Sequence, residues 1–211
     1  MMNSKGSISA GRGTYRHGDL RRTLLEAGIE MARQGGPDAV VLREATRQAG
    51  VVPNAAYRHF ASQQALLQAV RDHALSAAAT MMEAELAKIP ETLSPADAAR
   101  ASLRSVGRAY LRFAHAEPGL FRTAFAVQGS AGAAMAADSA RNPFRLLGAA
   151  LDRLVAAGIL PAARRPGAEY LAWSAVHGLA LLVTDGPLFS MTAAERQAVE
   201  ERLLDMVEGG L

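Results

Sequence analysis

Three neighbouring residues carry side chains that suit a phosphate backbone. Tyr57 and His59 can donate hydrogen bonds to phosphate oxygens, and Arg58 lies between them. Arg43 and Arg47 precede them and add two positive charges. Such contacts position a protein on a nucleic acid without reading its sequence. Plainer alternatives remain open: Tyr57 as a core residue, His59 as a helix cap, and the two arginines as solvated surface charges.

Small residues come directly before this group, as a helix that reads base edges requires. Asn54, Ala55 and Ala56 are small enough for such a helix to enter the major groove of DNA. Asn54 can bond an adenine with two hydrogen bonds, or it can cap a short helix. We place Pro53 and Asn54 nearest the bases, whereas Arg58 faces either base edges or solvent. The full set expected at the DNA is Arg43, Arg47, Val52, Pro53, Asn54, Ala55, Tyr57, Arg58, His59 and Gln63.

The remaining polar residues give little support to catalysis or metal binding. Ser174, His177 and Asp185 occur in one stretch, but no nucleophile elbow surrounds the serine and no strand precedes it. The five histidines lack the spacing of metal ligands, and the chain has no cysteine. The sequence therefore predicts no enzymatic activity, no metal and no cofactor.

The composition favours helices as the elements that hold these side chains. The chain has 211 residues, of which 45 are Ala and only 24 are the β-branched Val, Ile and Thr. Ala loses least on entering a helix, whereas β-branched residues lose side-chain freedom. No apolar run approaches the roughly 20 residues of a membrane span, and no secretory signal is present. We expect an all-α protein of the cytoplasm that has no membrane partner.

Positive charge is concentrated in the first third of the chain. Residues 1–75 carry 10 Lys and Arg against 6 Asp and Glu, whereas residues 76–211 carry 13 against 14. The net charge of +3 therefore arises in the first third. This asymmetry favours an anionic partner for that part alone, although an imbalance of this size also arises by chance.

Apolar residues at helical spacing, with helix-breaking residues between them, define about nine helices. Ser62, Ser94 and Thr192 are the expected N-caps of three of them. Gly129–Asp138 is rich in Ala and Gly and weakly defined, and residues 161–167 are expected to form a loop. The expected helices span Tyr15–Gln34, Leu42–Ala49, Pro53–His59, 62–88, 94–113, Leu120–Phe125, Pro143–Gly158, Tyr170–Thr184 and Thr192–Val207.

The second and third of these helices fit a helix-turn-helix. Gly50 and Val51 form the turn between them. The first helix of such a pair braces the second, and the second must be short, with few bulky apolar residues facing outward. Val51 and Phe60 are the natural core anchors.

Residues 15–70 resemble the DNA-binding domain of the TetR family of bacterial transcriptional regulators. The segment DAVVLREATRQAGVVPNAAYRHFASQQALLQAV (38–70) carries the signature AGV, then YRHF, then Leu66-Leu67. Trp173, His177 and Gly178 are also similar to a W…HG motif in one branch of the C-terminal domains. The resemblance implies a homodimeric, sequence-specific DNA-binding repressor. It also implies that a small ligand relieves repression by changing the separation of the two reading heads.

Five positions depart from the family pattern: Val41, Ala45, Thr46, Val52 and Gln63. Family members usually have Ser or Thr at positions 41 and 52, and commonly Lys at position 63. These changes at positions 41, 52 and 63 remove groups that bind phosphate. Each lost cation reduces the slope of log affinity against log salt concentration by about one unit. Either the backbone affinity is lower than is typical of the family, or a flexible N-terminal arm compensates.

The sequence divides into three expected parts. Residues 1–14 form a flexible basic arm, residues 15–62 the helix-turn-helix domain, and residues 63–211 a helical ligand-binding and dimerisation domain. The last two helices, Tyr170–Thr184 and Thr192–Val207, are expected to pair with their copies in a second chain as a four-helix bundle. Both also fit the core of a monomer.

Met and aromatic residues of the C-terminal part are candidates for an effector pocket. Among many alanines they permit a cavity, and the helix 170–184 offers a ligand no charged side chain. The expected effector is therefore hydrophobic and uncharged or weakly anionic. His177 is either a buried histidine satisfied by the protein or the polar contact of the pocket. The candidates are Met81, Tyr110, Phe113, Phe121, Phe125, Phe144, Trp173 and His177, each of which alone also fits an ordinary core residue.

A competing class of protein remains open from the sequence alone. It is a helical small-molecule-binding protein or enzyme that has lost DNA binding. The two classes differ in one measurable property, because only a DNA-binding regulator has a salt-dependent affinity for duplex DNA.

Overall fold

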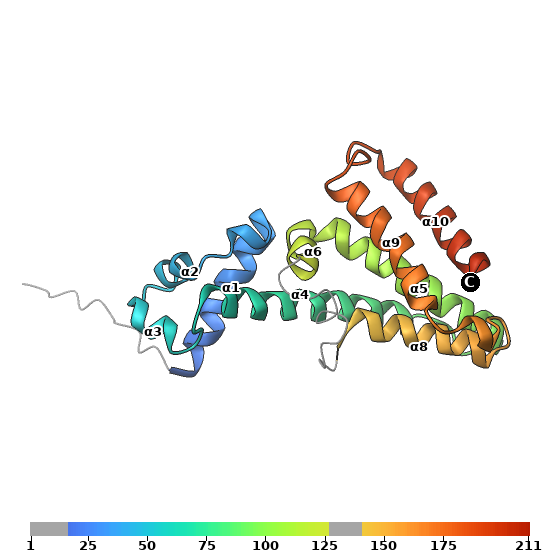
Figure 1. Cartoon of the computed structure of the whole chain (residues 1–211), viewed down its shortest axis with the longest axis horizontal. Helices are drawn as coiled ribbons and strands as arrows, with labels where there is room; N and C mark the ends of the chain where they lie inside the picture. The colour runs from blue at the N-terminus through green and yellow to red at the C-terminus, as the bar shows by residue number, and fades with distance from the viewer. Residues whose placement is uncertain (1–16, 127–140) are drawn as a thin grey trace, which may run out of the picture.

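The computed structural model of the protein describes residues 17–126 and 141–211. These residues form nine α-helices and two short 3-10 turns, and no strand occurs among them. The all-α prediction is therefore confirmed. The molecule is elongated, with a small head of three helices at one end and a larger helical body at the other (Figure 1).

The head consists of α1 (His17–Gly35), α2 (Leu42–Gln48) and α3 (Pro53–Tyr57), with a 3-10 turn at Pro37–Ala39 between the first two. Its core is built from one apolar face of each helix. Leu24 of α1, Leu42 of α2 and Ala56 of α3 are all buried there. Because α2 and α3 are too short to be stable alone, their helical structure depends on this packing.

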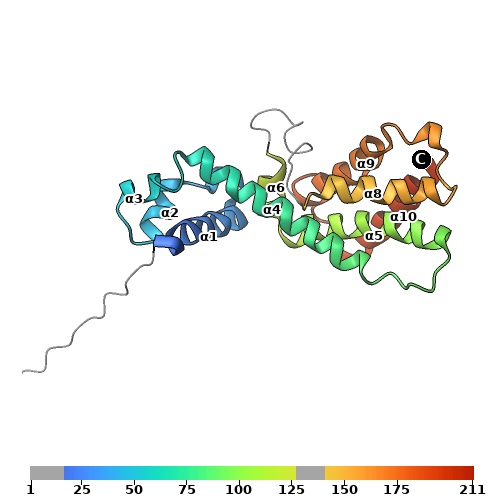
Figure 2. The same cartoon turned by 90° about the horizontal axis from the view of Figure 1, so that it is seen from below.

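Helix α4 (Gln63–Leu86) joins the head to the body, since it packs against α1 at one end and against α5 and α8 further along. Figures 1 and 2 show it running from the head into the body. The side-chain oxygen of Ser62 caps α4 by accepting a hydrogen bond from the Ala65 amide at 3.1 Å. The crossing with α1 is close, because a Cβ on Gly28 would lie 2.9 Å from Val70 Cγ2.

Five further helices form the body around α4. They are α5 (Pro95–Ala116), α6 (Pro118–Phe125), α8 (Pro143–Ala156), α9 (Ala168–Thr184) and α10 (Ala193–Gly210). Helix α5 is central, since it packs against α4, α6, α8, α9 and α10. Ser94 caps α5, and Thr192 forms a capping box with Glu195 at the start of α10, so the predicted N-caps are confirmed.

The remaining differences from the sequence expectation are small. Helix α3 ends at Tyr57, two residues before the expected end, and α9 begins at Ala168, two residues before the expected start. Residues 161–167, expected to form a loop, contain a 3-10 turn at Ala162–Arg164. Tyr15, Arg16, the arm 1–14 and the Gly129–Asp138 segment lie outside the described residues.

Candidate nucleic-acid interface and effector cavity

The turn between α2 and α3 is fixed by a glycine. Gly50 has a φ of 65°, a left-handed conformation that glycine adopts without strain. The Gly50 amide donates to the Arg47 carbonyl at 3.1 Å, and the Val51 amide donates to the Thr46 carbonyl at 3.3 Å. These two bonds are those of a Schellman motif, which ends α2 and turns the chain into α3.

Helix α3 exposes one face and buries the other. Ala56 and Phe60 are buried in the head, whereas Val52 is 69% exposed and Tyr57 is 55% exposed. Pro53 and Asn54 are exposed as well, and Ala55 is half-buried. The structure thus leaves the small predicted reading residues and the Tyr57 hydroxyl accessible to a partner. The core alternative for Tyr57 does not fit this exposure.

The cations beside α3 differ in their partners. Glu44 accepts hydrogen bonds from Arg47 at 2.6 and 2.9 Å, so the Arg47 charge is partly neutralised within α2. The bond from Arg47, with a weaker contribution from Gln48, lowers the pKa of Glu44 to about 2. Arg43 and Arg58 are exposed and form no ion pair with any described residue. These two arginines therefore keep their full charge for an anionic partner.

Two other predicted residues, His59 and Gln63, lie at the edge of the surface formed by α3. A further cation near it, Arg21, was not predicted from the sequence. His59 is half-buried and Gln63 is exposed at the start of α4. The guanidinium of Arg21 lies 5.2 Å from the centroid of the Phe60 ring, in a cation–π contact. Sequence reasoning missed Arg21 because α1 meets the end of the helix-turn-helix only in the folded head.

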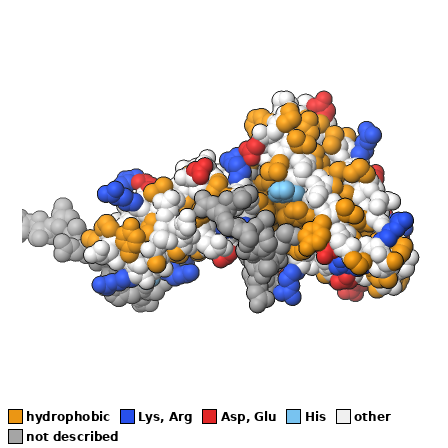
Figure 3. Space-filling model, in the orientation of Figure 1, with side chains coloured by type: hydrophobic (Ala, Val, Ile, Leu, Met, Phe, Trp, Pro, Cys, Tyr) orange, Lys and Arg blue, Asp and Glu red, His pale blue; other side chains and the backbone are white. Residues whose placement is uncertain are grey.

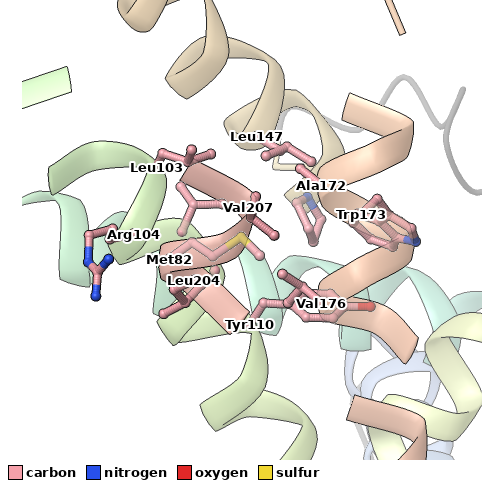
Figure 4. A pocket seen from close by; sticks show the side chains of 13 residues that line it. Met82, Leu103, Arg104, Tyr110, Leu147, Ala172, Trp173, Val176, Leu204 and Val207 are labelled. Atoms are coloured by element: carbon pink, nitrogen blue, oxygen red, sulfur yellow. The ribbon is translucent and has the colours of Figure 1, made fainter. Parts of the chain in front are cut away.

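A small apolar cavity lies inside the body. Its volume is about 30 Å³, which is room for one or two water molecules. Figure 4 shows the apolar side chains around this space, with the guanidinium of Arg104 pointing away from it. The wall comes from α4, α5, α8, α9 and α10, through Met82, Leu103, Arg104, Val106, Gly107, Tyr110, Pro143, Leu147, Ala172, Trp173, Val176, Leu204 and Val207.

Two of the eight predicted pocket residues, Tyr110 and Trp173, belong to this wall. The other six lie outside it. Phe113 and Phe121 are buried, whereas the remaining four are half-buried. Sequence reasoning missed the contribution of α10, because Leu204 and Val207 face the cavity only after α10 packs on α5. The six residues outside this wall are Met81, Phe113, Phe121, Phe125, Phe144 and His177.

Next to the cavity, aromatic rings pack around a hydrogen-bonded pair. The hydroxyl of Tyr110 lies 2.7 Å from Nδ1 of His177. Phe121, Phe125 and Trp173 place their ring centroids between 5.1 and 5.9 Å from the His177 ring. His177 thus has a partner within the protein at Nδ1, which agrees with one of the two alternatives that the sequence left open.

Burial favours the neutral forms of both Tyr110 and His177. It lowers the pKa of His177 and raises the pKa of Tyr110 well above its ordinary value. A neutral imidazole can accept at Nδ1 only when its proton is on Nε2. With the proton on Nε2 the Tyr110 hydroxyl donates to His177 Nδ1, and with the proton on Nδ1 the imidazole donates to the hydroxyl oxygen, so the tautomer sets the direction of this bond.

The described residues offer neither a membrane-spanning helix nor a metal site. No helix in residues 17–126 or 141–211 is both long and apolar enough to span a membrane. Within the same ranges, no three His, Asp or Glu side chains come together as a metal site would require.

Two family models match this chain. Residues 24–70 match the model of bacterial regulatory proteins of the tetR family, which includes α2 and α3. Residues 103–207 match the model of a tetracyclin repressor-like C-terminal domain, which includes Trp173 and His177. No curated protein matches the sequence.

Solved structures with a similar fold cover almost the whole chain. A protein of unknown function from Rhodococcus sp. RHA1 has 26% sequence identity and a TM-score of 0.75, over 95% of this chain and 99% of its own. The TetR family transcriptional regulator PfmR from Thermus thermophilus has 21% identity and a TM-score of 0.57, over 89% and 98% of the two chains. A tetR family regulatory protein from Rhodococcus RHA1 has 16% identity and a TM-score of 0.58, over 89% and 96%. With both family models matched in order along one chain, the protein belongs to the TetR family of bacterial transcriptional regulators.

Proposed function

We propose that the protein is a homodimeric repressor that binds a palindromic DNA operator and releases it when a hydrophobic effector enters the body. The observation that carries this proposal is the exposed face of α3, together with Arg43 and Arg58, which are exposed and form no ion pair with a described residue. In this arrangement Tyr57, His59 and the arginines contact phosphates, and Pro53 and Asn54 meet base edges. Residues 15–62 act as the reading domain and residues 63–211 as the regulatory domain, in the cytoplasm where the DNA lies.

The outer faces of α9 and α10 support dimerisation. Large apolar side chains are exposed there, although α9 packs against the body on its other side. Figure 3 shows hydrophobic side chains on the surface of this part of the body. Such a surface is typical of a protein–protein contact, and one short reading helix contacts too few bases to act alone. The exposed residues are Tyr170, Leu171, Leu181 and Leu182 of α9, Phe189 of the segment between the two helices, and Met206 of α10.

The effector site that we propose is the cavity beside Trp173. At about 30 Å³ it is far smaller than the several hundred Å³ of an ordinary ligand pocket. An effector therefore has to separate the helices around it. Because a ligand shifts a conformational equilibrium only through its different affinities for two states, this expansion is the state that the effector selects.

Helix α6 offers a mechanical connection from this site to the head. Phe121 and Phe125 of α6 pack in the aromatic cluster next to the cavity. At its other end, a Cβ on Gly119 would lie 2.2 Å from the carbonyl oxygen of Ala32, so α6 touches the backbone of α1 directly. The Arg33–Glu117 ion pair, at 3.1 Å, joins the same two elements. Movement of α6 away from the cavity would therefore turn the head.

The proposal is tested by selecting duplexes from a random pool and measuring their binding by fluorescence anisotropy. We expect a palindrome bound by two chains, with half-site centres about 34–36 Å or a multiple apart. Affinity should fall steeply as the salt concentration rises. Binding by a monomer, or an affinity indifferent to salt, would contradict the proposal and favour a helical ligand-binding protein or enzyme without DNA binding.

A further inference from the structure

An open groove lies at the end of the body farthest from the head, where α4 ends, α5 begins and α8 ends. Figures 1 and 2 both place these three helix ends together. The groove has a volume of about 420 Å³, within the range of small-molecule sites. It is separate from the central cavity, with which it shares no residue. Most of its wall is apolar, with Leu86, Ile89, Leu93, Ala98 and Ala156 among the residues that line it.

One cation is held in this wall. The Arg153 guanidinium donates to Ser102 Oγ at 3.0 Å, and Ser102 Oγ donates to the Ala98 carbonyl at 2.7 Å. Ser102 is buried and also lines the groove, so it fixes the position of the guanidinium. A guanidinium has five N–H donors, and this contact uses one of them.

No carboxylate of the described residues neutralises the charge of Arg153, whose side chain is exposed. Among residues 17–126 and 141–211 it forms no ion pair, and Glu91, the carboxylate of the groove wall, does not reach it. The neighbouring surface of α5 is different, because Arg100 and Arg104 are both paired with carboxylates of α10. The groove therefore combines apolar walls with a positioned, uncompensated positive charge.

We propose that this groove binds an amphipathic monocarboxylate, with the carboxylate on Arg153 and the aliphatic chain along the apolar wall. A guanidinium and a carboxylate form two parallel, charge-assisted hydrogen bonds. Burial of the chain against the alanine and leucine side chains adds the hydrophobic contribution. Because Leu103, next to Ser102 on α5, lines the central cavity, a ligand here acts on a helix that both sites share.

The probe for this site is sodium octanoate, titrated into the full-length protein without DNA and followed by isothermal titration calorimetry. We expect saturable binding of one octanoate per chain, and weaker binding of octan-1-ol, which has no charge. Arg153→Gln should weaken octanoate binding by about tenfold or more, because it removes the charged partner. The matched control is Arg145→Gln on the same helix, which is exposed and outside the groove, and which should change binding less than about twofold.

A second variant tests the groove by its shape. Ala156 is exposed at the end of α8, so Ala156→Trp should leave the fold intact, fill the groove and abolish octanoate binding. The inference is overturned if octanoate does not bind saturably at millimolar concentration, or if it binds Arg153→Gln as tightly as the original protein. Operator binding, measured separately on the same preparations, decides the proposed function and does not depend on this result.

Discussion

The head and the body use their arginines in different ways. In the body, Arg100, Arg104 and Arg108 of α5 are paired with carboxylates of α10, and Arg122 of α6 is paired with Asp185. In the head, Arg43 and Arg58 face solvent without any ion pair to a described residue. Composition alone shows only that the first third is more basic. The structure adds that the arginines of α5 named here are compensated within the body, whereas Arg43 and Arg58 of the head keep their charge for a partner.

The reading face of the head and the joint between head and body also differ in how closely they are packed. The reading face of the head is open, and a Cβ on Gly50 would meet nothing within 4 Å. The joint between head and body is closed, since Gly119 lies directly against the backbone of α1. A change at the joint should therefore affect stability, whereas a change on the reading face should affect binding.

The largest effect is expected at the joint. Gly119→Ala places a methyl group 2.2 Å from the Ala32 carbonyl oxygen, so α1 and α6 must separate. We expect a loss of about 3 kcal/mol in the free energy of unfolding, measured by urea denaturation. The matched control is Gly148→Ala in α8, whose Cβ would meet only Arg165 at 3.7 Å. It should be neutral or stabilising by about 0.5–1 kcal/mol, and similar losses for the two variants would contradict the close joint.

On the reading face, two substitutions should separate positioning from specificity. Tyr57→Phe removes one phosphate donor and should weaken binding by about 1 kcal/mol for all sequences alike. Asn54→Ala should instead change the preference at one or two base pairs, by about 1–3 kcal/mol each. Both residues are exposed, so neither variant should unfold the head. A changed preference with Tyr57→Phe and none with Asn54→Ala would reverse the two roles.

The salt dependence of operator binding should show which cations are free. Arg43→Gln should reduce the slope of log affinity against log salt by about one unit, and Arg47→Gln by less, because Glu44 already holds Arg47. Glu44→Gln should free Arg47, tighten binding and steepen the slope. With the pKa of Glu44 at about 2, this carboxylate is ionised at every pH suited to the assay. Equal slopes for the two arginine variants would show that the internal pair opens on DNA.

The smallest expected effect is the contribution of His177 to the pH dependence of folding stability. Burial lowers its pKa, so the neutral form is favoured in the folded protein. Its contribution to stability is therefore complete above the unfolded pKa of about 6.5, and is lost as the pH falls through the lower folded value. In the protonated imidazole both ring nitrogens are donors, so Nδ1 can then only donate to the Tyr110 hydroxyl oxygen.

We expect the melting temperature to fall between pH 7.5 and pH 5.5, and to fall less in His177→Asn. The remaining pH dependence in that variant should come in part from His73 and His115, whose pKa values are also lowered by burial. An identical fall in both proteins would show that His177 does not contribute.

Local sequence determined much of the architecture. The N-caps at Ser62, Ser94 and Thr192 and the turn at Gly50 act through residues at most a few positions away, so they could be read directly from the chain. The order of the helices followed from apolar spacing, which is also local. The helix-turn-helix signature could also be recognised from the sequence, because its residues lie within one short segment.

Only the tertiary structure decided which distant residues meet. The pairing of α5 arginines with α10 carboxylates, the bond between Tyr110 and His177, and the wall that α10 gives the cavity all join residues far apart in sequence. Many helix packings satisfy the same apolar pattern, and the pattern does not distinguish an aromatic ring beside a cavity from one within it. The sequence therefore determined the helices and the reading head. The packing of those helices decided that Tyr110 and Trp173 line the cavity while His177 is held by the protein.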